Sequence, residues 1–270
     1  MYLADYHTHS NCSPDGTLPM AEMVKAAVDK GLQEICLTDH LDTFYWKDLS
    51  LRDDYDWDKA KKQYEEACRL YGDRILIKLG CELGDAQLSP EHAEHLLAAT
   101  PELDFIIGSV HLSGAKNGNN KSLFFIEQGD ADFYRGVIDD YLDEVEMVAK
   151  WGKCSVLGHI TLPLRYINQK YHEGLTYAGH MDRVAEIFRI IIPKGIGIEY
   201  NTNRGDEPRP YKEILQLYRD MGGEIITLGS DAHSAELVGR EIRERQELLR
   251  QCGFKYFTTF TKRKPEWQKL

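Results

Sequence analysis

The chain has 270 residues and a formal net charge of -11. This length suits one large α/β domain, and because no linker or internal repeat divides the chain, we expect a single domain over residues 1–270. The acidic surplus argues against a nucleic-acid partner, which needs a basic face. No secretion signal opens the chain and no apolar stretch approaches the ~18 residues of a membrane span, so we expect a cytoplasmic protein without a membrane partner.

Apolar runs alternate with amphipathic stretches along the chain, which is the pattern of βα units around a mostly parallel sheet. Seven runs are predicted as strands, at residues 2–6, 34–37, 75–79, 105–110, 155–158, 197–200 and 225–228. Residues 19–30 carry apolar side chains at helical spacing and end before Gly31, so they are predicted as a helix. A longer helix is predicted over residues 130–150. An eighth apolar run, residues 254–260, is predicted as a strand without an assigned place in the sheet.

Unusual polar residues follow the predicted strands. A His-x-His pair follows the first strand and an Asp-x-His pair follows the last, and residues two apart on a strand point to the same face. The two pairs can meet only where the first and last strands are neighbours, as in a closed barrel. The residues at strand ends are His7, His9, His40, Glu82, His111, His159, Asp231 and His233. Because barrel enzymes build their active sites at the C-terminal ends of strands, this placement predicts an active site there.

The donor atoms of this set indicate a metal centre. Imidazole and carboxylate ligands without thiolate suit zinc, manganese or iron better than magnesium or calcium. Asp15, in the Ser13-Pro14-Asp15-Gly16 turn, extends the set, which is large enough for two or three divalent ions with Glu82 as a bridging carboxylate. Such a cluster holds a hydroxide and clamps the oxygens of an in-line displacement. The chemistry predicted is phosphoester hydrolysis, with a small phosphorylated metabolite as the substrate.

Short motifs along nearly the whole chain resemble those of the polymerase and histidinol phosphatase (PHP) family of metal-dependent phosphoesterases. They are Tyr6-His7-Thr8-His9-Ser10, Asp15-Gly16, Leu37-Thr38-Asp39-His40, Gly80-Cys81-Glu82, Gly108-Ser109-Val110-His111, Gly158-His159, Glu199-Tyr200-Asn201-Thr202 and Gly229-Ser230-Asp231-Ala232-His233. The end of the chain, residues 256–265, is similar to the histidinol-phosphatase branch. The resemblance implies a distorted (β/α)7 TIM-like barrel.

The resemblance also implies a trinuclear metal site. By position in the motifs, three groups of ligands are implied: His7, His9, Glu82 and Asp231 for one ion; Glu82, His111 and His159 for a second; Asp15, His40 and His233 for a third. Some relatives have histidine where this chain has Asp15. A carboxylate there still serves as a ligand and favours manganese or iron.

Two arginines on rim loops, Arg165 and Arg204, are predicted to bind the substrate phosphate, because a guanidinium offers a planar fork of donors. The resemblance implies hydrolysis of L-histidinol phosphate in histidine biosynthesis, by attack of a metal-bridging hydroxide. Arg165 is expected to stabilise the developing charge. Asp231 is one candidate to relay a proton to the leaving alkoxide, and His233 or the third ion is the alternative that stabilises it.

Two loops beside the predicted site are distinctive. Residues 41–57 interleave aromatic and acidic side chains, which suits either contact with a cationic, imidazole-bearing leaving group or a lid. Residues 113–128 are polar and flexible where an aromatic side chain is expected in this branch. The histidines outside the strand-end pattern are not expected in the site: His92, His95 and His172 are predicted to lie at the surface, and His180 is predicted to begin a helix.

Three alternatives remain at this point. The first is a nucleotide phosphatase or exonuclease of the same family, against which the acidic charge counts for long polynucleotides. The second is an amidohydrolase, which normally carries a bridging lysine where this chain has Glu82. The third is a non-enzymatic metal-binding module.

Overall fold

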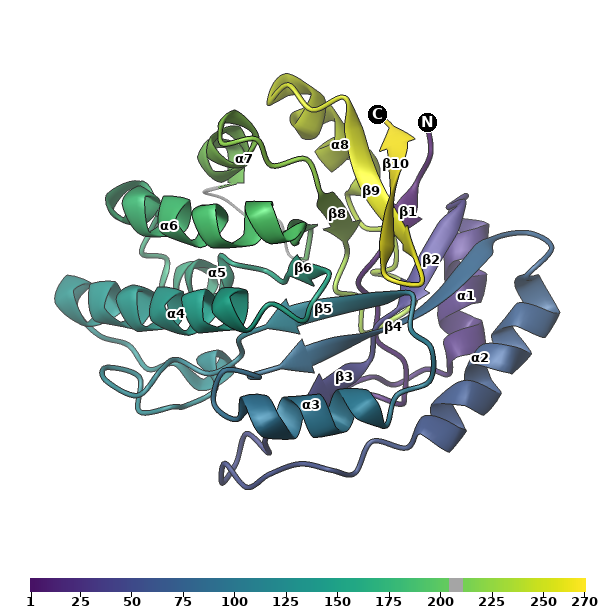
Figure 1. Cartoon of the computed structure of the whole chain (residues 1–270), viewed down its shortest axis with the longest axis horizontal. Helices are drawn as coiled ribbons and strands as arrows, with labels where there is room; N and C mark the ends of the chain where they lie inside the picture. The colour runs from purple at the N-terminus through teal and green to yellow at the C-terminus, as the bar shows by residue number, and fades with distance from the viewer. Residues whose placement is uncertain (204–210) are drawn as a thin grey trace.

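Seven parallel strand positions curl into a nearly closed barrel (Figure 1) in the computed structural model, which describes residues 1–203 and 211–270. The strand order is β1-β2-β4-β5-β6-β7-β8, and β3 pairs with β4 off this path. The strands are β1 (Ala4–Asp5), β2 (Glu34–Leu37), β3 (His40–Asp42), β4 (Leu76–Gly84), β5 (Phe105–Ser109), β6 (Val156–Leu157), β7 (Gly197–Asn201) and β8 (Ile226–Gly229). The predicted fold class, a distorted seven-position α/β barrel, is confirmed.

The barrel closes where β1 meets β8. The Tyr6 N–H donates to the Leu228 carbonyl at 2.8 Å, and the His9 N–H donates to the Ala232 carbonyl at 2.8 Å. Thr8 and Ala232 form a parallel bridge between these two hydrogen bonds. The closure therefore sets the His-x-His pair after β1 beside the Asp-x-His pair after β8, as the sequence predicts.

The second strand position is broken, which is the main distortion of the barrel. The first half of β4 pairs with β2, and its second half pairs with β3, with His40 beside Glu82. At the break, the Asp39 carboxylate accepts hydrogen bonds from the N–H and the hydroxyl of Ser10. The break lets His40 begin a new strand at the level of Glu82.

The third predicted strand is longer than expected, because β4 continues through Gly80 and Gly84 to include Glu82. Both glycines weaken a strand signal in the sequence. They are required by close packing: a Cβ at Gly80 would lie 2.7 Å from the Phe105 carbonyl oxygen, and one at Gly84 would lie 2.1 Å from Asp42 Oδ1. Glu82 thus lies within the strand rather than past its end.

Helices cover the outside of the barrel (Figure 1). In the described residues they are α1 (Met20–Asp29), α2 (Trp57–Tyr71), α3 (Pro90–Ala98), α4 (Ala131–Trp151), α5 (Leu162–Tyr171), α6 (Met181–Ile191), α7 (Tyr211–Asp220) and α8 (Ile242–Gln251). Both helices predicted in detail, α1 and α4, lie within one residue of their expected bounds. The Asp130 side chain caps α4 by accepting from the Phe133 N–H at 2.9 Å, and Gly152 ends it in a left-handed conformation.

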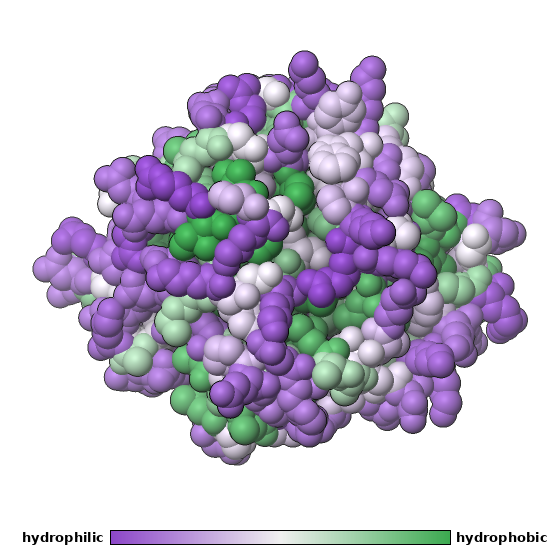
Figure 2. All heavy atoms as spheres, viewed as in Figure 1, coloured by the Kyte–Doolittle hydropathy of each residue, from purple (hydrophilic) through white to green (hydrophobic). Residues whose placement is uncertain are grey.

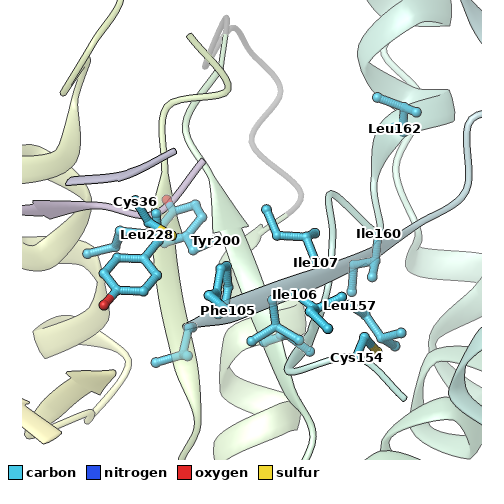
Figure 3. Packing of buried hydrophobic residues seen from close by; sticks show 14 of the residues in the cluster. Cys36, Phe105, Ile106, Ile107, Cys154, Leu157, Ile160, Leu162, Tyr200 and Leu228 are labelled. Carbon is cyan, nitrogen blue, oxygen red and sulfur yellow. The ribbon is translucent and has the colours of Figure 1, made fainter. Parts of the chain in front are cut away.

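Apolar and polar side chains divide the barrel interior into two levels. Phe105 and Ile107 share a face of β5 with Ser109, because side chains alternate along a strand. The two apolar residues belong to the buried core (Figure 3), whereas the Ser109 hydroxyl donates to Glu82 Oε1 at 2.7 Å. The core thus fills the end where the strands begin, and polar groups gather where they end.

The eighth predicted strand forms β9 (Tyr256–Thr261), which pairs antiparallel with β10 (Lys264–Lys269) in a separate hairpin. The Phe260 ring lies 4.9 Å from that of Phe105, at the beginning of β5, and its N–H donates to Tyr6 Oη at 2.7 Å. Thr258 Oγ1 accepts from the N–H of Ile226, the first residue of β8. The hairpin therefore packs against the N-terminal end of the barrel, opposite the polar end.

The outer surface is mostly hydrophilic on the face shown in Figure 2, with apolar patches between the helices. Within residues 1–203 and 211–270, every helix is too short or too polar to cross a bilayer.

Candidate metal centre

All nine predicted ligands lie together at the C-terminal end of the barrel. The first pair follows β1, His40 begins β3, Glu82 lies in β4, and the others follow β5, β6 and β8. Asp15 reaches the same place from the turn after the first pair. Seven of the nine line a cavity of about 260 Å³, namely Asp15, His40, Glu82, His111, His159, Asp231 and His233. His7 and His9 are fully buried beneath it.

Glu82 is the centre of the cluster, with a side chain that is 1% exposed. Its Oε2 atom lies 3.2, 3.6 and 3.1 Å from ring nitrogens of His7, His9 and His40. Its Oε1 atom lies 2.8 Å from His159 Nε2 and 3.1 Å from His111 Nε2. One carboxylate therefore faces five imidazoles that come from four different strands or strand ends, an arrangement suited to a bridging ligand.

The residues present fit divalent metal ions. His7 Nε2, His9 Nε2, His40 Nδ1 and Glu82 Oε2 are buried and have no hydrogen-bond partner among the described residues. Buried polar atoms nearly always have such a partner. Ligand atoms lie within 4.8 Å of one another in three overlapping groups, which are His7-His9-Glu82, His40-Glu82-His111 and His9-His40-His233. Nitrogen and oxygen donors at this density suit a cluster of transition-metal ions.

Asp231 and Asp15 complete the predicted groups from the rim. Asp231 Oδ1 lies 3.5 Å from His9 Nε2, and the residue has a left-handed backbone with φ of 52°, which is uncommon outside glycine and often marks a functional site. Asp15 Oδ2 lies 3.0 Å from His233 Nε2 and 3.6 Å from His40 Nε2. The other ring nitrogen of His40, Nδ1, faces Glu82. His40 therefore lies between the ligands predicted for the second ion and those predicted for the third.

The charges of the cluster favour bound cations. Burial opposes ionisation of Glu82, but His7 and His40 outweigh it and hold the pKa of Glu82 well below its ordinary value. Burial also opposes a charged His40, yet Asp42 and Glu82 raise its pKa to about 10. Burial together with His233 and His40 lowers the pKa of His9 to about 3. The carboxylates thus remain ionised and His9 neutral, which are the forms that bind metal, whereas His40 gives up a proton when it becomes a ligand.

Arg165 lies beside the cluster in the first turn of α5. Its Nη1 donates to Asp231 Oδ2 at 2.9 Å and its Nη2 donates to Asn201 Oδ1 at 2.7 Å. Both partners come from the ends of strands, so the guanidinium is fixed at the wall of the cavity. Arg204 lies outside the described residues, and its neighbour Asn203 lines the same cavity.

Three polar residues of this site had no role assigned from the sequence, although two of them, Glu199 and Asn201, belong to a family motif. Asp42 is buried and its Oδ1 lies 3.2 Å from His111 Nδ1, although in sequence it is one acid of the 41–57 loop. Glu199 Oε1 lies 2.6 Å from His7 Nδ1, and Asn201 holds Arg165. The available signal was again spacing, because His40-x-Asp42 and Glu199-x-Asn201 place two polar residues on one face of a strand.

Both distinctive loops reach the cavity. Trp46, from the 41–57 loop, lies edge-on to the His40 ring with centroids 5.7 Å apart. Phe124, in a short 3₁₀ helix (η1, Leu123–Phe125) of the 113–128 loop, lines the cavity and meets the Tyr166 ring edge-on. Each of the two loops thus contributes one aromatic side chain to the lining of the cavity. His92 is partly buried rather than at the surface, whereas His95 and His172 are exposed, and His180 lies at the start of helix α6, as predicted.

A family model and several relatives match this chain. The model for the PHP domain matches residues 5–203. The chain therefore belongs to the PHP domain family, as its motifs indicate.

The relatives extend the match over nearly the full length. The chain is 28% identical over 264 residues to the Histidinol-phosphatase of Lactococcus lactis, covering 95% of this chain and 94% of that protein. It is 25% identical to the "Probable histidinol-phosphatase" of Clostridium acetobutylicum, covering 93% and 94%. The crystal structure of histidinol phosphate phosphatase from Lactococcus lactis, complexed with zinc, L-histidinol and phosphate, superposes with a TM-score of 0.82 at 26% identity, covering 98% of each chain.

Proposed function

We propose that this protein is a metal-dependent phosphomonoesterase that hydrolyses L-histidinol phosphate to L-histidinol and phosphate, a step of histidine biosynthesis. The observation that carries the proposal is the convergence of imidazoles and carboxylates on Glu82, beside a fixed arginine at one cavity. The full-length similarity to proteins named histidinol-phosphatase supports the substrate. A structure of such a relative with zinc, L-histidinol and phosphate supports both the metal and the substrate.

The proposed ligand sets are those that the family motifs imply. His7, His9, Glu82 and Asp231 hold one ion, Glu82 with His111 and His159 a second, and Asp15 with His40 and His233 a third. The ions are zinc, manganese or iron. Divalent ions bound in this way supply Lewis acidity toward phosphoryl oxygens and make a water molecule nucleophilic at neutral pH.

Arg165 is proposed to bind and orient the phosphate. Burial opposes its charge, but Asp231 outweighs this and raises the pKa of Arg165 above its already high ordinary value. Its hydrogen bonds to Asp231 and Asn201 use two N–H groups of a guanidinium that has five, so donors remain for phosphate oxygens. Fixed before substrate arrives, it stabilises developing charge without reorganisation. Arg204 is proposed as a second phosphate ligand.

Proton transfer to the leaving alkoxide is assigned to Asp231, whose ionised carboxylate would take the proton released by the attacking water and pass it to the leaving oxygen. Its Oδ2 is held by Arg165 and its Oδ1 faces the first histidine pair, so the carboxylate lies between the proposed phosphate ligand and the proposed metal ligands. His233 is the alternative, because it is 29% exposed at the mouth of the cavity where the leaving group departs.

The cavity wall suits an imidazole-bearing alcohol as the leaving group. Trp46, Phe124 and Tyr166 are part of its lining. Aromatic faces attract cations and stack on planar rings, and L-histidinol phosphate offers both an ammonium group and an imidazole. A nucleotide would use the same aromatic surface, which makes nucleotides the informative competitors.

The test is release of inorganic phosphate by zinc-, manganese- or iron-loaded protein. L-histidinol phosphate is compared with nucleoside monophosphates, nucleoside bisphosphates and sugar phosphates at equal concentration. We expect kcat/KM to be highest for L-histidinol phosphate. A clear preference for a nucleotide would overturn the substrate, and the absence of phosphate release from every ester would overturn the phosphatase.

A further inference from the structure

Glu199 is a buried carboxylate that the proposed ligand sets leave out. It lies in β7 and is 1% exposed. Its Oε1 atom faces His7 Nδ1 at 2.6 Å, and its Oε2 atom accepts the backbone N–H of His159 at 2.8 Å. Both of its oxygens are therefore directed at the side of the cluster away from the cavity, toward two residues proposed to bind different ions.

The contact with His7 decides which ring nitrogen carries the proton. A carboxylate accepts hydrogen bonds, so Glu199 holds a proton on Nδ1, and a metal ion at this ring would take the Nε2 lone pair. That Nε2 atom lies 3.2 Å from Glu82 Oε2 and 3.8 Å from Asp231 Oδ1. A carboxylate behind a histidine in this manner orients the ring and strengthens it as a metal ligand.

Glu199 also acts on Arg165, through Asn201. The Asn201 amide nitrogen donates to both Glu199 oxygens at 3.3 Å and to Asp231 Oδ2 at 3.4 Å. Because carboxylates accept only, the amide oxygen must turn the other way, and there it accepts from Arg165 Nη2 at 2.7 Å. The orientation of one amide thus links Glu199 to the arginine that faces the phosphate.

The close approach of these groups requires a glycine. A Cβ at Gly229, in β8, would lie 2.4 Å from His7 Cβ and 2.5 Å from Glu199 Oε1. The neighbouring strand therefore has no side chain at the place where Glu199 meets His7. The backbone of β8 leaves room for this one carboxylate–imidazole contact.

We propose that Glu199 is a positioning residue that sets two parts of the site at once: the metal-binding tautomer of His7 and, through Asn201, the direction of Arg165. This inference rests on the proposed function, because it takes His7 as a metal ligand and Arg165 as a phosphate ligand. Glu199 itself touches neither substrate nor metal in this assignment.

The nearly isosteric variant E199Q is a sharp test. The two Glu199 oxygens accept from three groups, His7 Nδ1–H, the His159 N–H and the Asn201 amide, and a glutamine has one oxygen and one NH2 group to face them. At least one donor is therefore left opposite another donor. We expect zinc affinity, measured by competition with a chromogenic chelator, to fall about 10–100-fold. We also expect KM for L-histidinol phosphate to rise, because Asn201 loses one of the groups that turn its oxygen to Arg165, although Asp231 and the Asn203 N–H still contact the amide.

E34Q is the matched control. Glu34 is 2% exposed and accepts hydrogen bonds from Tyr2 and Tyr6, at the end of the barrel away from the site. E34Q should keep wild-type zinc affinity and KM. If only E199Q shows weaker zinc binding and a higher KM, the effect comes from the position of Glu199 and not from neutralising a buried carboxylate in general. E199Q and E199A with wild-type zinc affinity and wild-type KM would overturn the proposal.

A measurement on the wild-type protein tests the tautomer without any variant. In zinc-loaded protein with ¹⁵N-labelled histidine, we expect the proton of His7 on Nδ1. A proton on Nε2 would overturn the proposal even if E199Q fails to fold. The outcomes also separate the two hypotheses: wild-type protein that binds zinc but releases no phosphate contradicts the proposed function, whereas the zinc affinities of E199Q and wild type still decide the role of Glu199.

Discussion

Arg165 Nη1 lies 2.9 Å from Asp231 Oδ2, although the two residues are 66 positions apart in the chain. One comes from the first turn of α5 and the other from the loop after β8, so the barrel fold alone brings them together. The contact joins the proposed phosphate ligand to the proposed metal ligand and proton carrier. The first prediction addresses this pair.

The variant R165A should lower kcat/KM for L-histidinol phosphate by about 10–100-fold, because hydrogen bonds to charged groups contribute roughly 1.5–3 kcal/mol each. The main change should be in KM, and metal content should stay at the wild-type value. R165K should recover only part of the loss, since an ammonium lacks the planar fork. Steady-state kinetics with metal analysis checks this. Wild-type kinetics in R165A would remove Arg165 from the site.

The variants H9A and E82A should both lose bound metal and nearly all turnover. His9 Nε2 faces Glu82 and Asp231, and Glu82 faces five imidazoles, so each deletion removes a ligand that several neighbours share. H95A is the control, because His95 is exposed on α3 and distant from the cavity lining. Metal per chain after gel filtration, with phosphate release, is the measurement. Full activity in E82A would contradict the bridging role.

Removal of metal should abolish activity and lower the thermal midpoint of unfolding. Ions that bind the folded chain but not the unfolded chain stabilise the fold by about 2.7 kcal/mol when the free ion concentration is a hundred times Kd. The buried carboxylates Glu82 and Asp231 also lose their compensating cations when the metal leaves. Dialysis against a chelator, then calorimetry and activity before and after adding zinc, tests both effects. A chelated protein with unchanged midpoint and activity would contradict a bound cluster.

The variant F124A should reduce the preference for L-histidinol phosphate over a small sugar phosphate. Phe124 lines the cavity, and an aromatic contact with a cation contributes about 0.5–2 kcal/mol, which corresponds to roughly 2–30-fold in relative kcat/KM. The neighbouring variant F125A provides the control, because Phe125 is 62% exposed and does not line the cavity. An equal fall in kcat/KM for both esters would mean that Phe124 supports the structure of the protein and does not select the leaving group.

The variant F260A should destabilise the protein by about 3–5 kcal/mol, which is the usual cost of removing a buried aromatic ring. Phe260 is 2% exposed and packs on Tyr6 and Phe105 at the N-terminal end of the barrel. Because the site lies at the other end, folded F260A should keep its metal. Urea unfolding measures the change, with W267A as control, since Trp267 in β10 is 49% exposed. A loss below 1 kcal/mol would contradict the packing role of the hairpin.

The order of the strands and the place of the site could be predicted from local patterns. Buried parallel strands are continuous apolar runs, so residues 34–37 and 105–110 were recognisable without any tertiary information. The histidine and carboxylate positions follow such runs, and a parallel barrel places all C-terminal strand ends at one rim. The relative direction of a pair such as His7 and His9 could therefore be predicted from the sequence, because residues two apart on a strand share a face.

Only the tertiary structure decided the contacts between these strand ends. That His40 turns one nitrogen to Glu82 and the other to Asp15 depends on the break between β2 and β3, which no local propensity signals. No role in the site was predicted for Asp42 or Glu199, and their contacts with His111 and His7 depend on the folded barrel. The physical reason is that the spacing of residues along a strand sets only the side of the strand to which each side chain points. Which side chain it meets across the barrel depends on how the barrel closes and on the register of its strands. It also depends on the close approach that Gly84 and Gly229 permit.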